Sequence, residues 1–172
     1  MPYYRVVGEV PRKRHVRFRR PDGGLYAEEL MGEEGFSSDS SLLYHRHAPT
    51  AIIKSEGVTE AAGDGALEPN HPLRPRAYRT QDLPVGGDLV LGRQVLVGND
   101  DVRISYVAVD PADGPSELYR NSVGDEVVYV QSGAARFEST YGALDVGEGD
   151  YVVIPTGTIH RWVAAPGETL RT

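Results

Sequence analysis

The sequence contains no cysteine, so the chain can form neither a disulfide nor a thiolate metal site. It also lacks an apolar run of about 18 residues, the length that a membrane-spanning helix needs. Its first ten residues, MPYYRVVGEV, lack the apolar core of a signal peptide. With 172 residues, of which 40% are hydrophobic, the chain can bury one core. These features predict a soluble, cytoplasmic protein.

Positive charge is scarce except at the amino terminus. The chain has a formal net charge of −7 at pH 7, yet residues 1–20 carry seven Lys or Arg against the single acidic residue Glu9. A basic arm of this kind can contact nucleic acid. We favour a solvated arm, or one that pairs with acidic surface on its own or a neighbouring subunit, because the acidic remainder would repel phosphate. We therefore expect no nucleic acid and no membrane among the partners.

The chain changes character near residue 87. Residues 1–87 are rich in Gly, Pro and Ser and show little apolar periodicity, which is too little for a core of their own. Short strands are predicted near Tyr3–Val7 and Thr50–Lys54, and a helical turn near Tyr26–Met31. We expect this irregular segment to pack on the following domain or on a partner subunit.

Residues 88–172 consist of short β-rich runs bounded mostly by Gly, Pro, Asp or Asn. Several of these runs alternate apolar and polar residues, as half-buried antiparallel strands do. Seven runs with short connections and no helical pattern between them predict an all-β sandwich or small barrel. The runs are DLVLGRQVLVG, DVRISYVAVD, DEVVYVQSG, AARFEST, GALDVG, DYVVIP and TIHRWVAA.

The stretch GDYVVIPTGTIHRW contains Gly149, Pro155, Gly157 and His160. Their spacing, G-x5-P-x-G-x2-H, is similar to the second sequence motif of the cupin family. In that motif the glycine opens a strand, the Pro-x-Gly segment makes a tight turn, and the next strand points a histidine into the mouth of a barrel. The resemblance implies a cupin-like (RmlC-like jelly-roll) antiparallel β-barrel over residues 88–172.

The first cupin motif, H-x-H-x3–4-E-x6-G, is present only in part. Glu126 and Gly133 keep the E-x6-G spacing. The two histidine positions fall on Arg120 and Ser122 or, in the other register, on Tyr119 and Asn121, and none of these is a usual metal ligand. Glu126 and His160 alone are too few for a stable mononuclear site. We therefore expect no catalytic, cofactor-binding or metal-binding residue, with Glu126 and His160 as vestigial cupin positions.

Two other histidines, His45 and His47 in YHRHAPT, form an H-x-H pair. On a strand both would face one side, but no carboxylate follows at the cupin spacing. They are interpreted as surface or hydrogen-bonded loop histidines. His15 and His71 are interpreted as solvated.

The inner face of the predicted barrel follows from strand alternation. If Glu126 and His160 face inward, then Val128, Val130 and Trp162 share their face. Either Val152 and Ile154 or Tyr151 and Val153 should join them. Apolar packing, rather than a ligand cavity, is therefore expected inside.

Longer blocks carry a more specific resemblance. PDGGLYAEELMGEEGFSSDSSLLYHRHAPTAI and RNSVGDEVVYVQSGAARFESTYGALDVGEGDYVVIPTGTIHRW together resemble the amino-terminal part of homogentisate 1,2-dioxygenase, and more closely its bacterial, actinomycete-type relatives. The resemblance implies a two-cupin, homo-oligomeric enzyme of tyrosine and phenylalanine catabolism that cleaves a small aromatic substrate. It implies Fe(II) held by two histidines and a glutamate of the carboxy-terminal cupin, with the amino-terminal cupin as scaffold.

The sequence ends at GETLRT, where the resemblance leads us to expect further strands and a second cupin. We therefore expect a barrel that is incomplete at its C-terminus, in an amino-terminal portion that is inactive alone and contributes fold and assembly. The alternative is a stand-alone, metal-free cupin that binds a small molecule or serves as a structural module.

Overall fold

The described strands are short, from two to six residues long. The computed structural model describes residues 6–8, 18–32, 37, 40–50, 54 and 68–172. The chain divides into two compact units, Met1–Glu56 and Gly57–Thr172. The predicted boundary after residue 87 stays a prediction.

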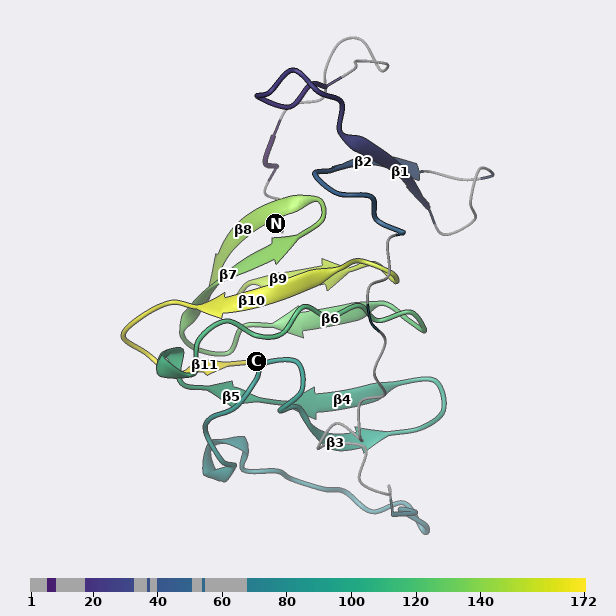
Figure 1. The fold of residues 1–172 in the computed structure, drawn as a ribbon. Helices are drawn as coiled ribbons and strands as arrows, with labels where there is room; N and C mark the ends of the chain where they lie inside the picture. Colours follow the sequence, from purple (N-terminus) through teal and green to yellow (C-terminus); the bar gives the residue numbers. More distant parts are fainter. Residues whose placement is uncertain (1–5, 9–17, 33–36, 38–39, 51–53, 55–67) are drawn as a thin grey trace. The chain divides into compact units, whose positions relative to one another are not determined.

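Every described element longer than three residues is a β-strand (Figure 1). The first unit contains β1 (Ala27–Gly32) and β2 (Ser40–His45). The second contains, in chain order, η1 (Thr80–Asp82), β3 (Gln94–Gly98), β4 (Arg103–Tyr106), β5 (Ala108–Val109), η2 (Pro111–Asp113), β6 (Glu126–Tyr129), β7 (Ala134–Ser139), β8 (Gly142–Gly147), β9 (Tyr151–Ile154), β10 (His160–Ala164) and β11 (Leu170–Arg171). η1 and η2 are single 3-10 turns. Each of the seven predicted β-rich runs contains at least one strand.

All strand pairs in the second unit are antiparallel. β7 lies between β8 and β10, while β3 pairs with β4, β5 with β11, and β6 with β9. The predicted all-β, cupin-like fold is confirmed. Among the described residues the sheets stay open, because their hydrogen bonds do not join them into one closed barrel. The final segment forms β11, in which Leu170 pairs with Val109.

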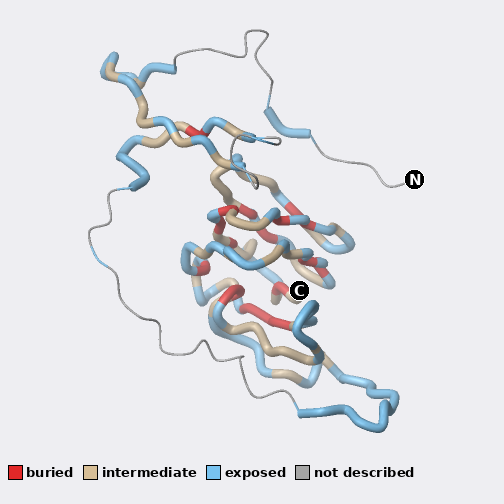
Figure 2. Tube along the Cα trace, turned by 90° about the vertical axis from the view of Figure 1, so that its right-hand side faces the viewer, coloured by how far each residue is buried: buried red, intermediate tan, exposed pale blue. Residues whose placement is uncertain are grey.

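The core of the second unit follows the predicted alternation. Val128, Val130 and Trp162 are buried, as predicted. Of the two alternatives on β9, Val152 and Ile154 face the core and their neighbours face outward, because β9 alternates exposed and buried positions. Figure 2 shows buried stretches along the strands and exposed loops at their ends. Further core members are Leu89, Val90, Val107, Val109, Ala135, Phe137, Val146 and Leu170.

The helical turn predicted near Tyr26–Met31 is wrong, because these residues lie mostly in β1. Their burial alternates with a period of two, with Glu29 half-buried between exposed Glu28 and Leu30. Ala, Glu, Leu and Met are good helix formers, but propensity is a weak prior. The six-residue pairing with β2, in which Leu30 lies opposite Leu42, overrides it.

Several predictions fall on residues that the structure leaves out. The strand near Tyr3–Val7 rests largely on residues 1–5 and the strand near Thr50–Lys54 largely on 51–53, and both ranges lie outside the described residues. Most of the basic arm, residues 9–17, lies outside them as well. Of its described members, Arg19 donates to the carbonyl of Gly23 at 2.9 Å. His71 is exposed, as predicted.

The described helices are far too short to cross a membrane: among the residues that the structure describes, no helix is long and apolar enough to do so.

Replacing Trp162 by alanine tests the core. Trp162 is 1% exposed and its ring packs against Phe137 at a centroid distance of 4.8 Å. Trp162→Ala should lower the free energy of unfolding by about 3–5 kcal/mol, because it deletes a fully buried aromatic ring. Urea denaturation measures the loss. Tyr78→Ala, at a position that is 53% exposed, is the control and should cost less than about 1 kcal/mol. Equal losses in the two variants would contradict this account of the core.

Candidate functional site

The pairing of β6 with β9 brings the two cupin-motif segments together. Glu126, at the start of β6, lies opposite Ile154, at the end of β9. The residues just outside this register are linked: the Asp125 carboxylate accepts from the Thr156 backbone N–H at 2.8 Å and from its hydroxyl at 2.9 Å. The N–H of Gly157 donates to the Asn121 carbonyl at 2.7 Å. The first motif's loop is thereby fastened to the second motif's turn.

His160 is the first residue of β10 and is buried, with 1% of its surface exposed. Its backbone exchanges two hydrogen bonds of 2.9 Å with Tyr119. Nδ1 lies 3.1 Å from the carbonyl oxygen of Thr158. Because a carbonyl can only accept, Nδ1 carries the proton in that bond. Nε2 is buried and has no hydrogen-bond partner among the described residues. The imidazole ring also contacts the rings of Tyr119 and Phe137, at centroid distances of 5.7 and 5.3 Å.

The carboxylate of Glu126 lies close to this imidazole. Its side chain is 10% exposed, and its Oε2 lies 4.0 Å from His160 Nε2, too far for a hydrogen bond. The same Oε2 accepts from Arg93 Nη2 at 3.1 Å. The other oxygen, Oε1, accepts from the Asn121 amide at 3.2 Å. The structure therefore brings the two predicted positions together, but the carboxylate is already bound by a guanidinium and an amide.

The structure decides between the two possible registers of the first motif. Tyr119 and Asn121 face the cluster, through the His160 ring and the Glu126 carboxylate respectively. Arg120 and Ser122 are exposed. The histidine positions of the motif therefore correspond to Tyr119 and Asn121, a choice that the sequence left open because the motif allows either three or four residues before the glutamate.

Arg93 is the member of the cluster that the sequence did not indicate. It precedes β3, far from both motifs, and belongs to no recognised spacing. Beside its bond to Glu126, its Nε donates to the Leu89 carbonyl at 3.2 Å. Its guanidinium carbon lies 5.8 Å from the centre of the Tyr119 ring, within reach of a cation–π interaction.

The turn before Arg93 holds it in place. Asp88 Oδ1 accepts from the N–H groups of Val90 and Leu91 at 2.6 and 2.9 Å, and Oδ2 accepts from Glu117 N–H at 2.6 Å. Gly92 closes the turn by donating to the Asp88 carbonyl at 2.7 Å. A Cβ at Gly92 would lie 2.6 Å from that carbonyl oxygen, so only glycine fits. Asp88 therefore ties the turn to the segment that leads to Tyr119.

Gly133, the last residue of the first motif, has a purely structural role. Its φ of +80° favours glycine, and a Cβ there would lie 2.8 Å from the Thr169 carbonyl oxygen. The close approach is that of the segment leading into β11. The E-x6-G spacing therefore reflects strand packing and requires no metal.

The two histidines of the H-x-H pair, His45 and His47, have different surroundings. His45, at the end of β2, donates from Nε2 to Glu29 Oε2 on β1 at 2.7 Å. His47 lies beyond the strand and is exposed. The carboxylate partner of His45 comes from the preceding strand, which spacing along the chain after His45 could not show. Both histidines belong to the first unit.

The residues present do not fit the metal that the cupin fold implies. Within the described part of the chain, no three His, Asp or Glu side chains group as a metal site would require. The Glu126 cluster offers one imidazole and one carboxylate, while a phenol and an amide stand at the histidine positions. The nearby guanidinium adds a positive charge that opposes a second cation. The absence of iron from this chain stays a prediction.

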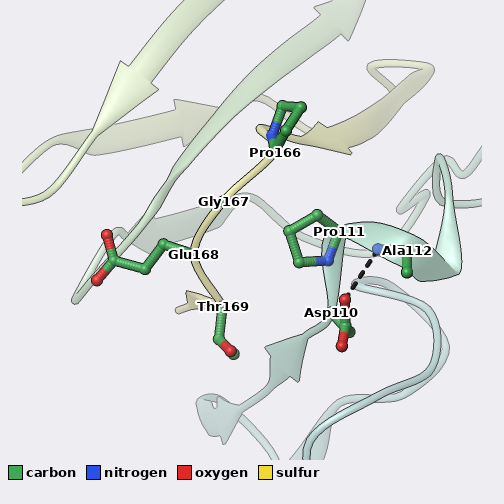
Figure 3. A pocket seen from close by; sticks show the side chains of 7 residues that line it. All are labelled: Asp110, Pro111, Ala112, Pro166, Gly167, Glu168 and Thr169. Atoms are coloured by element: carbon green, nitrogen blue, oxygen red, sulfur yellow. Dashed lines mark hydrogen bonds between the residues drawn. The ribbon is translucent and has the colours of Figure 1, made fainter.

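A surface pocket lies elsewhere in the second unit (Figure 3). It is lined by Asp110–Ala112 and by Pro166–Thr169, and the dashed line marks the 2.9 Å bond from Ala112 N–H to Asp110. Its two charged side chains, Asp110 and Glu168, are both acidic. These lining residues carry no positive side chain that would attract an anion.

Comparison with protein families agrees with this geometry. The family model described as a cupin domain matches residues 105–172. Residues 105–172 are therefore similar to a cupin domain, in agreement with the cupin-like fold. The match contains both motif segments, Tyr119 and Asn121 included, while Arg93 precedes it.

One curated relative matches most of the chain. A protein of Saccharolobus solfataricus named "Putative dioxygenase" is 40% identical over 161 residues, which are 93% of this chain and 41% of that protein. The chain thus spans about two fifths of the length of this curated relative.

Two solved structures are also similar. One is a cupin 2 conserved barrel domain protein from Rhodopseudomonas palustris, at 29% identity and a TM-score of 0.39, over 46% of this chain and 55% of that one. The other is a protein of unknown function from Streptococcus pyogenes, at 24% identity and a TM-score of 0.46, over 63% and 91%. Likenesses of this degree carry no argument about function.

Neutralising Asp125 tests the link between the motif segments. The backbone and side-chain hydrogen bonds from Thr156 lower the pKa of Asp125 below its ordinary value of 3.8. The folded state thus favours the charged form, so the stabilisation is complete above that value and is lost as pH falls through the lowered pKa. Asp125→Asn should lower the urea midpoint at pH 7, and its difference from wild type should shrink toward about pH 2.5.

The control for this comparison is Asp100→Asn, an exposed carboxylate on the β3–β4 turn. It should leave the midpoint unchanged at both pH values. A pH-independent difference between Asp125→Asn and wild type would show that the charge of Asp125 is not what matters.

Proposed function

We propose that this chain is the amino-terminal cupin portion of a longer dioxygenase-type protein and that it contributes fold and assembly rather than chemistry. The similarity to a protein named as a dioxygenase, over 93% of this chain but 41% of that protein, supports the larger context. The observation that carries the non-catalytic role is the Glu126 cluster. Its carboxylate is bound by Arg93 at 3.1 Å, and Tyr119 and Asn121 stand at the histidine positions.

The enclosed surroundings of His160 also support this role. A non-haem iron dioxygenase needs a metal with open coordination positions for substrate and oxygen. Here the imidazole is enclosed by the Tyr119 and Phe137 rings and is fully buried. Val130 and Trp162 fill the interior on the same face, at 0% and 1% exposure. Neither the donors nor the space suit ring cleavage.

The finer proposal is that the longer protein resembles homogentisate 1,2-dioxygenase of tyrosine and phenylalanine catabolism. It rests on the GLYAEEL and NSVGDE blocks of the sequence. On this proposal Fe(II) and the small aromatic substrate bind to a second, carboxy-terminal cupin, and the assembly is a homo-oligomer. The same proposal places the chain in the cytoplasm.

Iron and oxygen measurements test the non-catalytic role. The purified 172-residue chain is loaded anaerobically with Fe(II) and desalted, and its iron content and oxygen uptake with homogentisate are measured. We expect no retained iron and no uptake above the metal-free blank, because only one carboxylate and one imidazole are available. Near-stoichiometric iron that disappears in His160→Ala, or any turnover above the blank, would overturn the proposal.

The gene sequence beyond the codon for Thr172 tests whether this chain is part of a longer dioxygenase-type protein. We expect the gene, read beyond the codon for Thr172, to encode a second cupin with an H-x5-E pair and a further histidine. That longer product should retain Fe(II) and consume oxygen with homogentisate, and replacing either the histidine of its H-x5-E pair or the further histidine should abolish both. A stop codon directly after Thr172 would instead favour a stand-alone module.

A further inference from the structure

The buried carboxylate of Glu126 needs a positive partner. Its side chain is 10% exposed, and an isolated carboxylate in such a place is costly. In a metal-binding cupin the metal ion supplies the positive charge. Here two nitrogen groups approach the same oxygen, Oε2: Arg93 Nη2 at 3.1 Å and His160 Nε2 at 4.0 Å.

We propose that the guanidinium of Arg93 takes the place of the metal ion in this cupin domain. It compensates the charge of Glu126 and contacts two of the segments that a metal would link, those of Glu126 and Tyr119, so that the carboxylate is paired with a cation of the chain itself. This inference concerns the chain's own residues and holds whether or not the longer protein is a dioxygenase.

The position of the guanidinium supports the exchange. A divalent ion bound to Oε2 would lie about 2.0–2.2 Å from it, on the scale of zinc sites. The guanidinium nitrogen lies 3.1 Å from that same oxygen. Two cations cannot share one buried oxygen without strong repulsion. Arg93 and a metal are therefore alternatives.

The surrounding residues hold the guanidinium as coordination bonds would hold a metal. The Leu89 carbonyl, the Glu126 carboxylate and the Tyr119 ring contact it from three segments. The turn before it is fixed by Asp88 and allows only glycine at position 92. These contacts fix the position of the Arg93 side chain.

The other positions of the cluster, 119, 121 and 160, are placed where metal-ligating side chains could stand. Tyr119 pairs with His160 through two backbone bonds, and Asn121 already reaches Glu126. Within the described part of the chain, His160 Nε2 has no hydrogen-bond partner, and the bond from Nδ1 to Thr158 leaves the lone pair of Nε2 available. Histidines at positions 119 and 121 would complete a set of three imidazoles and one carboxylate once the guanidinium is removed.

The test is Co(II) binding to engineered variants of the 172-residue chain. We expect Arg93→Ala/Tyr119→His/Asn121→His to bind about one Co(II) per chain, measured by equilibrium dialysis and by the visible absorbance of the bound ion. Bound Co(II) should also raise the melting temperature. Tyr119→His/Asn121→His, which keeps Arg93, should bind at least about tenfold more weakly, because the guanidinium opposes the ion.

Two controls define the site. Adding His160→Ala to the triple variant removes one of the four ligands and should weaken Co(II) binding by at least about tenfold. Arg93→Ala/Arg120→His/Ser122→His places the histidines at the exposed positions of the other register and should bind no Co(II). If the variant that keeps Arg93 binds Co(II) as tightly as the triple variant, Arg93 does not take the metal's place and the proposal is wrong.

A second measurement decides the question if the triple variant fails to fold by circular dichroism. Urea midpoints are compared for Arg93→Met, Glu126→Gln and the double variant. Because removing one partner leaves the other buried and unpaired, we expect the double variant to lose clearly less than the sum of the single losses. Additive losses would show that the two groups do not compensate each other, and would overturn the proposal.

Discussion

The ion pair between Arg93 and Glu126 is the interaction on which this end of the domain depends. Burying a carboxylate is unfavourable unless a cation and hydrogen-bond donors accompany it. Arg93 supplies the cation, and the Asn121 amide binds the second oxygen. The pair therefore joins the turn before β3, the loop before β6 and β6 itself. His160 then completes the cluster through its backbone bonds to Tyr119.

The conformations and contacts of the cupin-motif residues explain their spacing without a metal. Gly133 is required where the segment entering β11 approaches its backbone. Gly157 has a φ of +83°, which favours glycine, and donates to Asn121. Thr156 donates twice to Asp125. These contacts fix the β6–β9 register, so a sequence without the histidines still needs the spacing around them. A motif match alone therefore predicts the turn and the fold, and the ligands must be checked separately.

The sequence predicted what depends on short-range patterns. Alternation gave the strands and the buried set of Val128, Val130 and Trp162, because one face of each strand is apolar. It did not predict β1, whose residues favour a helix and become a strand only by pairing with β2. It also missed Arg93, 33 residues before its partner Glu126. No local pattern marks an arginine that acts through tertiary contacts, and the burial of Glu126 could not be known without the fold.

The choice of arginine as the internal cation changes what the stability of the fold depends on. A bound metal stabilises by mass action, so its contribution falls as the free metal concentration falls. A guanidinium is attached to the chain and stays charged at any physiological pH, so its contribution depends on neither metal supply nor ordinary changes in pH. Its planar fork also matters, because Nε binds the Leu89 carbonyl while Nη2 binds Glu126. A lysine has a single ammonium and could not span both groups in this geometry. The site is therefore matched to the shape of arginine as well as to its charge.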